Sequence, residues 1–172
     1  RHGTHSPFVY KLADDVIYDF TNKSEYKNIE AQRKKLFNDD STIMVTDLDA
    51  GSHLNKNHKK KVSQIAKNAL KSPKLAQLIY RLAAYTKPKS AIELGTCLGI
   101  TSSYLSKACP GAEIITIEGC PETAGVARKN FKDLDLNNIE LHVGNFDLIL
   151  PDVIANQATL DFVYIDGNHR KD

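Results

Sequence analysis

The chain of 172 residues carries a net charge of +2 at pH 7 and is 41% hydrophobic, which is ordinary for a soluble globular protein. It holds no run of about 18 apolar residues, so no membrane-spanning helix and no membrane partner are expected. Three cysteines without a C-x-x-C pair argue against a disulfide framework and a zinc site, and they favour a reducing compartment such as the cytoplasm.

The first half of the chain is predicted to be helical and is the more basic half. Apolar residues at helical spacing predict helices over residues 7–20, 25–37, 57–70 and 73–86. Residues 42–48 suit a short extended segment, and the loop chemistry of residues 49–52 follows it. We interpret this loop either as a lid or as an ordinary surface connection. Residues 1–71 are therefore expected to form an all-helical N-terminal region.

Strands and helices alternate from residue 90 onward. Strands are predicted over residues 91–94, 113–118, 139–143 and 162–166, separated by helices over residues 100–108, 121–134 and 146–155. This alternation is typical of an α/β fold with right-handed crossovers and a parallel, Rossmann-like sheet. We expect the strand order 3-2-1-4 within a second domain over residues 72–172.

The last predicted strand, residues 162–166, leaves an apolar sheet edge close to the end of the chain. Proteins normally cover such edges, because they pair readily with other strands. We therefore expect the gene product to be longer, with further strands beyond residue 172. We also expect this chain to protect the edge by self-association, as a homo-oligomer.

Carboxylates end three of the four predicted strands. Glu93, Glu118 and Asp166 follow strands whose carboxyl ends meet at one edge of the expected sheet, where open α/β sheets bind ligands. A turn with two glycines, Gly95 and Gly99, follows Glu93, and glycine allows a backbone to approach a ligand closely. Cys97 within this turn is read either as a small turn residue or as a nucleophile.

These residues resemble the motifs of a known family. The run Glu93–Gly99, acid-x-Gly-x-x-x-Gly, resembles the first motif of class I S-adenosylmethionine-dependent methyltransferases, and Glu118 resembles their second-strand acid. Residues 163–169 resemble the fourth-strand motif of small-molecule O-methyltransferases, including the catechol type. The resemblance covers residues 72–172, and residues 1–10 also look like the start of bacterial O-methyltransferases.

The resemblance implies a binding site for S-adenosylmethionine. Glu93 is expected at the cofactor ammonium, Glu118 at the ribose hydroxyls, and Thr96 and Thr101 near the carboxylate at a helix N-terminus, which favours anions. Residues 144–146 are expected at the adenine. The implied cofactor-binding residues are Glu93, Gly95, Thr96, Gly99, Thr101, Glu118, Gly119, Cys120, Gly144, Asn145, Phe146 and Asp166.

Asp166 and His169 are the expected catalytic residues. In metal-dependent catechol-type enzymes the acid that matches Asp166 binds a divalent cation such as Mg²⁺, and a lysine three residues later acts as the base. His169 occupies that position here, and a histidine has a suitable pKa for accepting a hydroxyl proton. A surface or cofactor-proximal histidine is the alternative, and both metal and base stay open.

The expected function is methyl transfer to an oxygen of a small-molecule acceptor. A NAD-dependent oxidoreductase is one alternative, although the G-x-G-x-x-G spacing is absent. A nucleic-acid or protein methyltransferase is another. Enzymes that methylate amino groups of nucleic acids usually carry a Pro-Pro-aromatic run after the fourth strand, where this chain has Gly167-Asn168-His169, so no nucleic-acid partner is expected. A binding module without catalysis is the last alternative.

Overall fold

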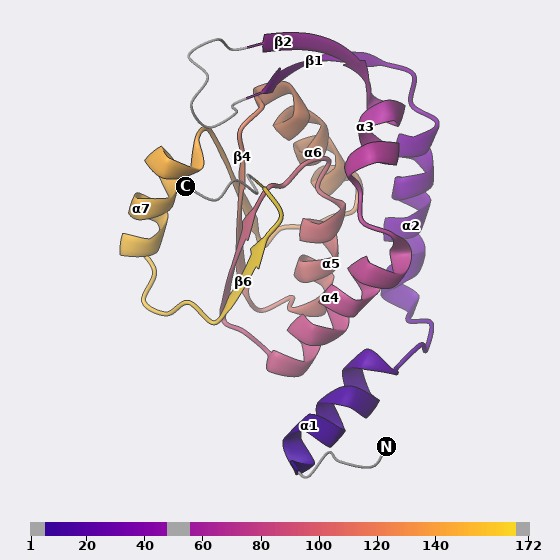
Figure 1. Ribbon diagram of the computed structural model, residues 1–172, viewed down its shortest axis with the longest axis vertical. Helices are drawn as coiled ribbons and strands as arrows, with labels where there is room; N and C mark the ends of the chain where they lie inside the picture. The colour runs from indigo at the N-terminus through magenta and orange to yellow at the C-terminus, as the bar shows by residue number, and fades with distance from the viewer. Residues whose placement is uncertain (1–5, 48–55, 168–172) are drawn as a thin grey trace.

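A computed structural model describes residues 6–47 and 56–167 of the chain. Its centre is a parallel four-stranded sheet in the order β5-β4-β3-β6. The strands are β3 (Ser90–Leu94), β4 (Glu113–Glu118), β5 (Ile139–Val143) and β6 (Phe162–Ile165). This order is the predicted 3-2-1-4, so the expected α/β, Rossmann-like fold is confirmed (Figure 1).

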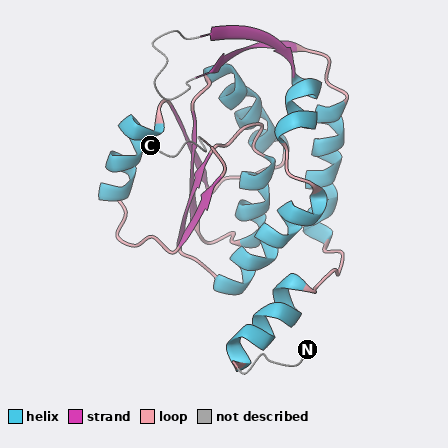
Figure 2. Ribbon diagram, in the orientation of Figure 1, coloured by secondary structure: helices cyan, strands magenta, loops and turns pink. Residues whose placement is uncertain are grey.

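Helices cover both faces of the sheet, as Figures 1 and 2 show. On one face lie α4 (Pro73–Thr86), α5 (Ile100–Ala108) and α6 (Pro121–Asp133), and α7 (Phe146–Ala155) lies on the other. Alternate residues of β3 separate the two cores: Ala91 packs with α4 and α5, whereas Ile92 packs with α7. The strand periodicity of two thus gives the sheet two apolar faces.

The N-terminal region contains helices and also a β-hairpin. After α2 (Ser24–Phe37), β1 (Thr42–Asp47) pairs antiparallel with β2 (Lys56–Lys61), and α3 (Val62–Ala69) follows. The predicted extended segment is present, but the prediction of a helix from residue 57 is wrong for its first five residues. A cluster of lysines opposes the positive end of a helix, and the strand removes that conflict. The region before residue 72 is therefore not all-helical.

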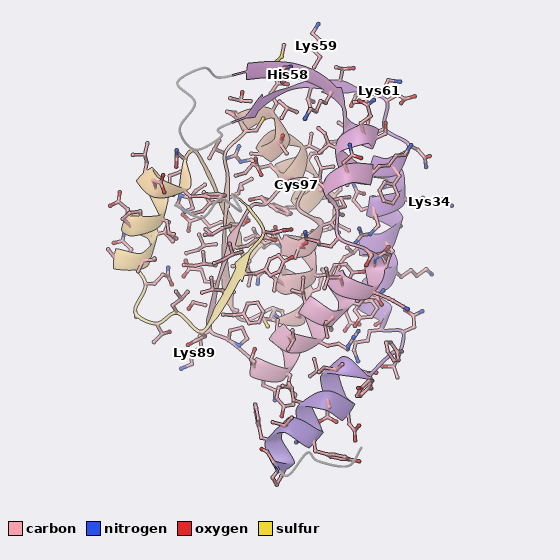
Figure 3. The ribbon with its side chains drawn as sticks, viewed as in Figure 1. Lys34, His58, Lys59, Lys61, Lys89 and Cys97 are labelled. Atoms are coloured by element: carbon pink, nitrogen blue, oxygen red, sulfur yellow. The ribbon has the colours of Figure 1, made fainter. Side chains whose placement is uncertain are left out.

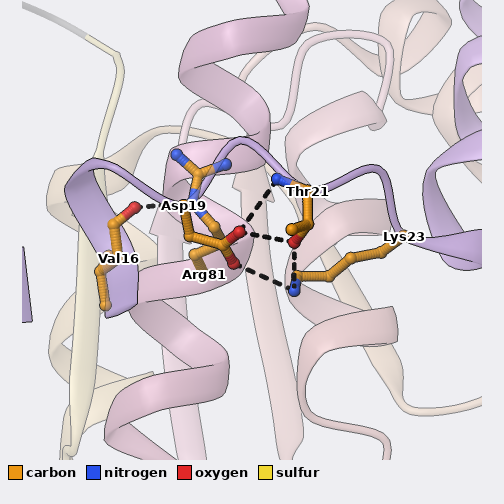
Figure 4. A network of polar contacts seen from close by, with 5 residues as sticks. All are labelled: Val16, Asp19, Thr21, Lys23 and Arg81. Atoms are coloured by element: carbon orange, nitrogen blue, oxygen red, sulfur yellow. Dashed lines mark hydrogen bonds and ion pairs between the residues drawn. The ribbon is translucent and has the colours of Figure 1, made fainter. Parts of the chain in front are cut away.

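The first predicted helix, over residues 7–20, is also shorter than expected. It consists of α1 (Pro7–Leu12), which projects from the body in Figure 1, and a π-helical turn, η1 (Ala13–Ile17). The Nε of Arg81 in α4 donates to the carbonyl of Val16 at 2.7 Å, which fixes the end of this turn (Figure 4).

Asp19 fixes the conformation of the segment that follows η1, through contacts with Thr21 and Lys23. It accepts from the backbone N–H of Thr21 at 2.9 Å and pairs with Lys23 at 3.1 Å (Figure 4). These hydrogen bonds, with that from the Thr21 side chain largest, lower the pKa of Asp19 to about 2. The carboxylate thus competes with helix continuation by binding the backbone locally.

The end strand β6 exposes apolar side chains on the face of the sheet that carries Ile92 and Leu94. Val163 is 48% exposed and Ile165 is 60% exposed, and no described strand pairs with the outer edge of β6.

None of the helices in the described part of the chain combines the length and apolarity needed to cross a membrane.

Candidate functional site

A cavity of about 560 Å³ lies at the carboxyl ends of the parallel strands. Its two walls come from different parts of the chain. The sheet wall consists of Gly95, Cys97, Glu118, Gly119, Cys120, Thr123, Gly144, Asn145, Phe146, Asp166 and Gly167. The N-terminal wall consists of Val45, Thr46, Lys60, Ile65, Asn68, Ala69 and Lys71.

The sheet wall brings together most of the cofactor residues expected from the sequence. Those that line the cavity are Gly95, Glu118, Gly119, Cys120, Gly144, Asn145, Phe146 and Asp166. They come from the tips of four strands, which parallel pairing places at one edge of the sheet. The other expected residues, Glu93, Thr96, Gly99 and Thr101, do not line it.

The glycine turn is held tightly against the tip of β6. Gly95 has φ +99°, and a Cβ at this position would lie 2.8 Å from the carbonyl oxygen of Asp166. The N–H of Asp166 in turn donates to the carbonyl of Leu94 at 2.8 Å. Only a residue without a side chain fits here, so the turn brings its backbone directly to the cavity.

Glu118 joins the glycine turn to the start of α6. Its carboxylate accepts from the N–H of Cys97 at 2.8 Å and from the N–H of Cys120 at 3.0 Å. Burial raises the pKa of Glu118, and these backbone hydrogen bonds oppose that shift. Each carboxylate oxygen has a second lone pair, so the group can accept further hydrogen bonds from a ligand in the cavity.

Glu93, although it also ends a strand, is fully buried beneath the turn. Its Oε2 accepts from the hydroxyls of Ser102 and Thr116, the latter at 2.6 Å, and Thr116 is 2.6 Å from the hydroxyl of Thr96. Oε1 is buried without a hydrogen-bond partner among the described residues. Burial, the largest cause, raises the pKa of Glu93 to about 7. This network supports the turn from inside.

Gly99 and Thr101 belong to the packing of α5. Gly99 precedes this helix with φ +78°, and a Cβ there would lie 2.5 Å from the ring of Phe131 in α6. Thr101 is buried in the first turn of the same helix. The close approach of two helices therefore accounts for the second glycine of the motif.

The opposite end of the sheet wall is built at the start of α7. Asn145 caps this helix through its side-chain oxygen, which accepts from the N–H of Asp147 at 2.8 Å. Phe146 lies so close to Gly167 that a Cβ on the glycine would be 2.8 Å from the ring. Both residues thus have fixed positions beside Gly144 at the cavity.

Cys97 is best explained as a turn residue. Its φ of +51° places it in the left-handed region, and its position beneath the hairpin is visible in Figure 3. Burial raises the pKa of its thiol to about 12, so the reactive thiolate is scarce at neutral pH. All three cysteines of the chain are free thiols.

The N-terminal wall was not foreseen in the sequence. The β1–β2 hairpin rests on the start of α6, where the N–H of Met44 donates to Glu122 at 2.6 Å and the N–H of Thr46 donates to the sulfur of Cys120 at 3.4 Å. Lys71 of the connection between α3 and α4 forms an ion pair of 2.6 Å with Asp166. A basic residue beside a helix-capping Ser-Pro pair was the one available signal for Lys71.

Several expectations lie outside the described residues. They are His169 as a base and the loop of residues 49–52 as a lid. Within residues 6–47 and 56–167, no group of three or more His, Cys, Asp or Glu side chains has a metal-binding arrangement.

A parallel sheet with a glycine turn and a strand-tip acid facing one cavity defines the nucleotide-binding class of Rossmann-like domains. Residues 92–172 match the model of a methyltransferase domain family. The methyltransferase match spans 81 of the 172 residues, and both the sequence relatives and the structural neighbours of the chain include O-methyltransferases.

The relatives agree on this class. A catechol O-methyltransferase of Niastella koreensis is 30% identical over 100 residues, which cover 56% of this chain and 45% of that protein. A human transmembrane O-methyltransferase is 33% identical over 82 residues, 46% of this chain and 28% of that protein. The matched part thus spans less than half of these relatives.

A solved structure extends the likeness in fold. The O-methyltransferase TomG from Streptomyces achromogenes, solved in complex with SAM, has a TM-score of 0.58 at 21% identity. The likeness covers 93% of this chain and 59% of that one. At this identity the agreement concerns the fold, including the N-terminal region.

Proposed function

We propose that the protein transfers the methyl group of S-adenosylmethionine to an oxygen of a small-molecule acceptor. The observation that carries this proposal is the position of Glu118, whose carboxylate faces the cavity between the glycine turn and the start of α6. An acid at the second strand tip accepts ribose hydroxyls in dinucleotide sites, and the same chemistry suits the ribose of this cofactor. The methyltransferase match over residues 92–172 supports this reading.

The sheet wall has the chemistry to hold such a cofactor. The turn at Gly95 offers backbone to the amino-acid end, and Glu118 offers acceptors to the ribose. At the other end, Cys120, Asn145 and Phe146 provide an apolar and polar surface for the adenine. Glu93 supports the turn from beneath, because its side chain does not line the cavity.

Methyl transfer requires positioning and removal of one proton. The cofactor supplies an electrophilic methyl group, which forms a bond with the acceptor oxygen while the carbon–sulfur electron pair stays on sulfur. The hydroxyl proton of the acceptor passes to a base, for which we propose His169, three residues after Asp166. Orientation of the two reactants within one cavity provides most of the rate.

A divalent cation on Asp166 does not fit the described residues. Lys71 already pairs with this carboxylate at 2.6 Å, and no metal-binding group of three ligands exists within the described ranges. A cation bound to Asp166 would also be close to the ammonium group of Lys71. Two unit positive charges 4 Å apart repel by about 4 kcal/mol at an effective dielectric of about 20, and a divalent ion roughly doubles this repulsion. We therefore derive no step through a metal.

Calorimetry with S-adenosylhomocysteine tests the proposal. We expect saturable one-to-one binding, and we expect NAD to give no thermal shift under the same conditions. Absence of S-adenosylhomocysteine binding, or preferential stabilisation by NAD, would contradict the proposed function. A screen of phenols, catechols and sugars as methyl acceptors then identifies the substrate.

We also propose a cytoplasmic homo-oligomer. The exposed Val163 and Ile165 on the edge strand β6 support self-association, and the three free cysteines support a reducing compartment. Light scattering that gives the mass of one chain at micromolar concentration would contradict the oligomer.

A further inference from the structure

We propose that Lys71, and not a divalent cation, neutralises Asp166 where the tip of β6 meets the cavity. This inference rests on the function proposed above and concerns the same site. Lys71 and Asp166 both line the cavity, and their charged atoms are 2.6 Å apart. In this role Lys71 is a positioning residue, because it acts through the carboxylate that ends β6.

The backbone of Lys71 is held in place by a buried arginine. Arg33 of α2 is 3% exposed, and its Nη1 donates to the carbonyl of Lys71 at 2.5 Å. The Nε of the same guanidinium pairs with Glu30 at 3.0 Å, and Glu30 also accepts from the hydroxyl of Tyr104 at 2.6 Å. The backbone of Lys71 is thus supported by a chain of partly buried polar contacts that reaches α5.

The connection that carries Lys71 is short and closed at both ends. The N–H of Leu70 donates to the carbonyl of Ala66 at the end of α3, and the side chain of Ser72 caps the start of α4. Lys71 is the residue between these two helix ends. Its backbone therefore has little freedom to move away from the cavity.

The partner carboxylate is equally fixed. The N–H of Asp166 donates to the carbonyl of Leu94 at 2.8 Å, and the carbonyl of Asp166 lies against Gly95. Lys71 is 29% exposed and Asp166 is 17% exposed, so solvent screens the pair only in part. Two fixed backbones thus present opposite charges to each other, a preorganised arrangement that costs little ordering on ligand binding.

This arrangement has a consequence for the cofactor. S-adenosylmethionine carries a positive sulfonium that S-adenosylhomocysteine lacks, so the ratio of their dissociation constants reports the net charge of the cavity. With Lys71 present, Asp166 contributes little net charge. Without Lys71, the cavity becomes one unit more negative and favours the cationic cofactor.

Calorimetry of both ligands on the whole protein tests the inference, with Lys71→Met, Lys71→Arg and Asp166→Asn as variants. We expect Lys71→Met to increase the preference for S-adenosylmethionine over S-adenosylhomocysteine by about five- to tenfold, the effect of one partly screened charge. We expect Lys71→Arg to restore the wild-type ratio, and Asp166→Asn to shift the ratio in the opposite direction. Lys67→Met, on the exposed face of α3, is the matched control and leaves the ratio unchanged.

Each titration is repeated with EDTA and with Mg²⁺. The inference predicts that neither changes the wild-type ratio. A wild-type ratio that depends on Mg²⁺ would overturn it and assign the charge to a divalent ion, and an unchanged ratio in Lys71→Met would also overturn it. If the wild-type protein binds neither ligand, the proposed function itself is refuted. Failure of the inference and failure of the proposed function are therefore distinguishable. Circular dichroism establishes that each variant is folded.

Discussion

The two walls of the cavity are built in different ways. The sheet wall is mostly backbone at strand tips, where the register of the parallel strands and the turn at Gly95 fix each position. The N-terminal wall is formed by side chains from a hairpin, a helix and one helix connection. It is attached through a few polar contacts, such as those of Glu122 and Asp166. Under the proposed function, we assign the cofactor to the sheet wall and the acceptor to the N-terminal wall.

The largest expected effect comes from the tightest point of the sheet wall. In Gly95→Ala, a Cβ would lie 2.8 Å from the carbonyl oxygen of Asp166, on a backbone with φ +99°. The left-handed conformation alone costs roughly 1–3 kcal/mol, and the contact forces β3 and β6 apart. We expect lower stability in urea unfolding and at least a hundredfold weaker binding of S-adenosylhomocysteine.

Gly125→Ala is the matched control for this substitution. Gly125 lies within α6, and a Cβ there would contact nothing within 4 Å. Alanine in a helix interior is favoured over glycine by up to about 1 kcal/mol, so this variant should be more stable. Wild-type stability and binding in Gly95→Ala would show that the turn is not constrained as described.

A smaller effect is expected from Glu118, which faces the cavity from β4. Glu118→Gln removes the charge that strengthens hydrogen bonds to ligand hydroxyls, and such bonds contribute about 1.5–3 kcal/mol. We expect binding of S-adenosylhomocysteine to weaken by about 10- to 100-fold in calorimetry, because 1.4 kcal/mol corresponds to about tenfold. Glu113→Gln, at the exposed far end of the same strand, is the control. Equal effects of the two substitutions would remove Glu118 from the binding site.

Glu93 provides a pH test of the buried side of the same wall. Its pKa in the folded protein, about 7, is above the ordinary value of 4.5, so between these pH values the folded state binds a proton that the unfolded state lacks. The stability contributed by this group is therefore complete below pH ~4.5 and is lost as the pH rises through ~7, by up to about 3 kcal/mol.

Glu93→Gln cannot ionise and should abolish this part of the pH dependence. We expect the free energy of unfolding of the variant, relative to that of the wild type, to be higher at pH ~8 than at pH ~5 by about 2.5 kcal/mol. The comparison between the two proteins cancels the titration of the other groups. A difference that does not change with pH would mean that Glu93 ionises normally beneath the turn.

The sheet wall was predictable because its signals are local. Strand periodicity predicted the strands, and the resemblance to methyltransferase motifs implied most of the residues that line this side. What these signals did not reveal is how deep in the sheet each acidic residue lies. Glu93 is in register with Thr116, two residues before Glu118, so it is enclosed by Ser102 and Thr116, whereas Glu118 opens to the cavity.

The N-terminal wall was missed because its contacts join residues far apart in the chain. Lys71 meets Asp166, and Met44 meets Glu122, through packing that no local pattern encodes. Apolar residues at helical spacing after residue 61 suggested a helix that begins at residue 57, although the lysines of residues 56–61 oppose a helix start. Pairing with β1 instead made this segment a strand, so tertiary context overrode the local pattern.

The smallest expected effect concerns the attachment of the hairpin to the sheet wall. Glu122→Ala removes the acceptor of the Met44 N–H, an exposed hydrogen bond whose loss should cost at most about 1 kcal/mol. We expect faster amide hydrogen exchange in β1 and several-fold weaker cofactor binding, with the sheet itself unaffected. Asp40→Ala is the control, because its pair with Lys61 is largely exposed, and exposed pairs contribute little. If exchange in β1 responds equally to both substitutions, the hairpin is not held by Glu122 and the N-terminal wall must be anchored mainly through Lys71.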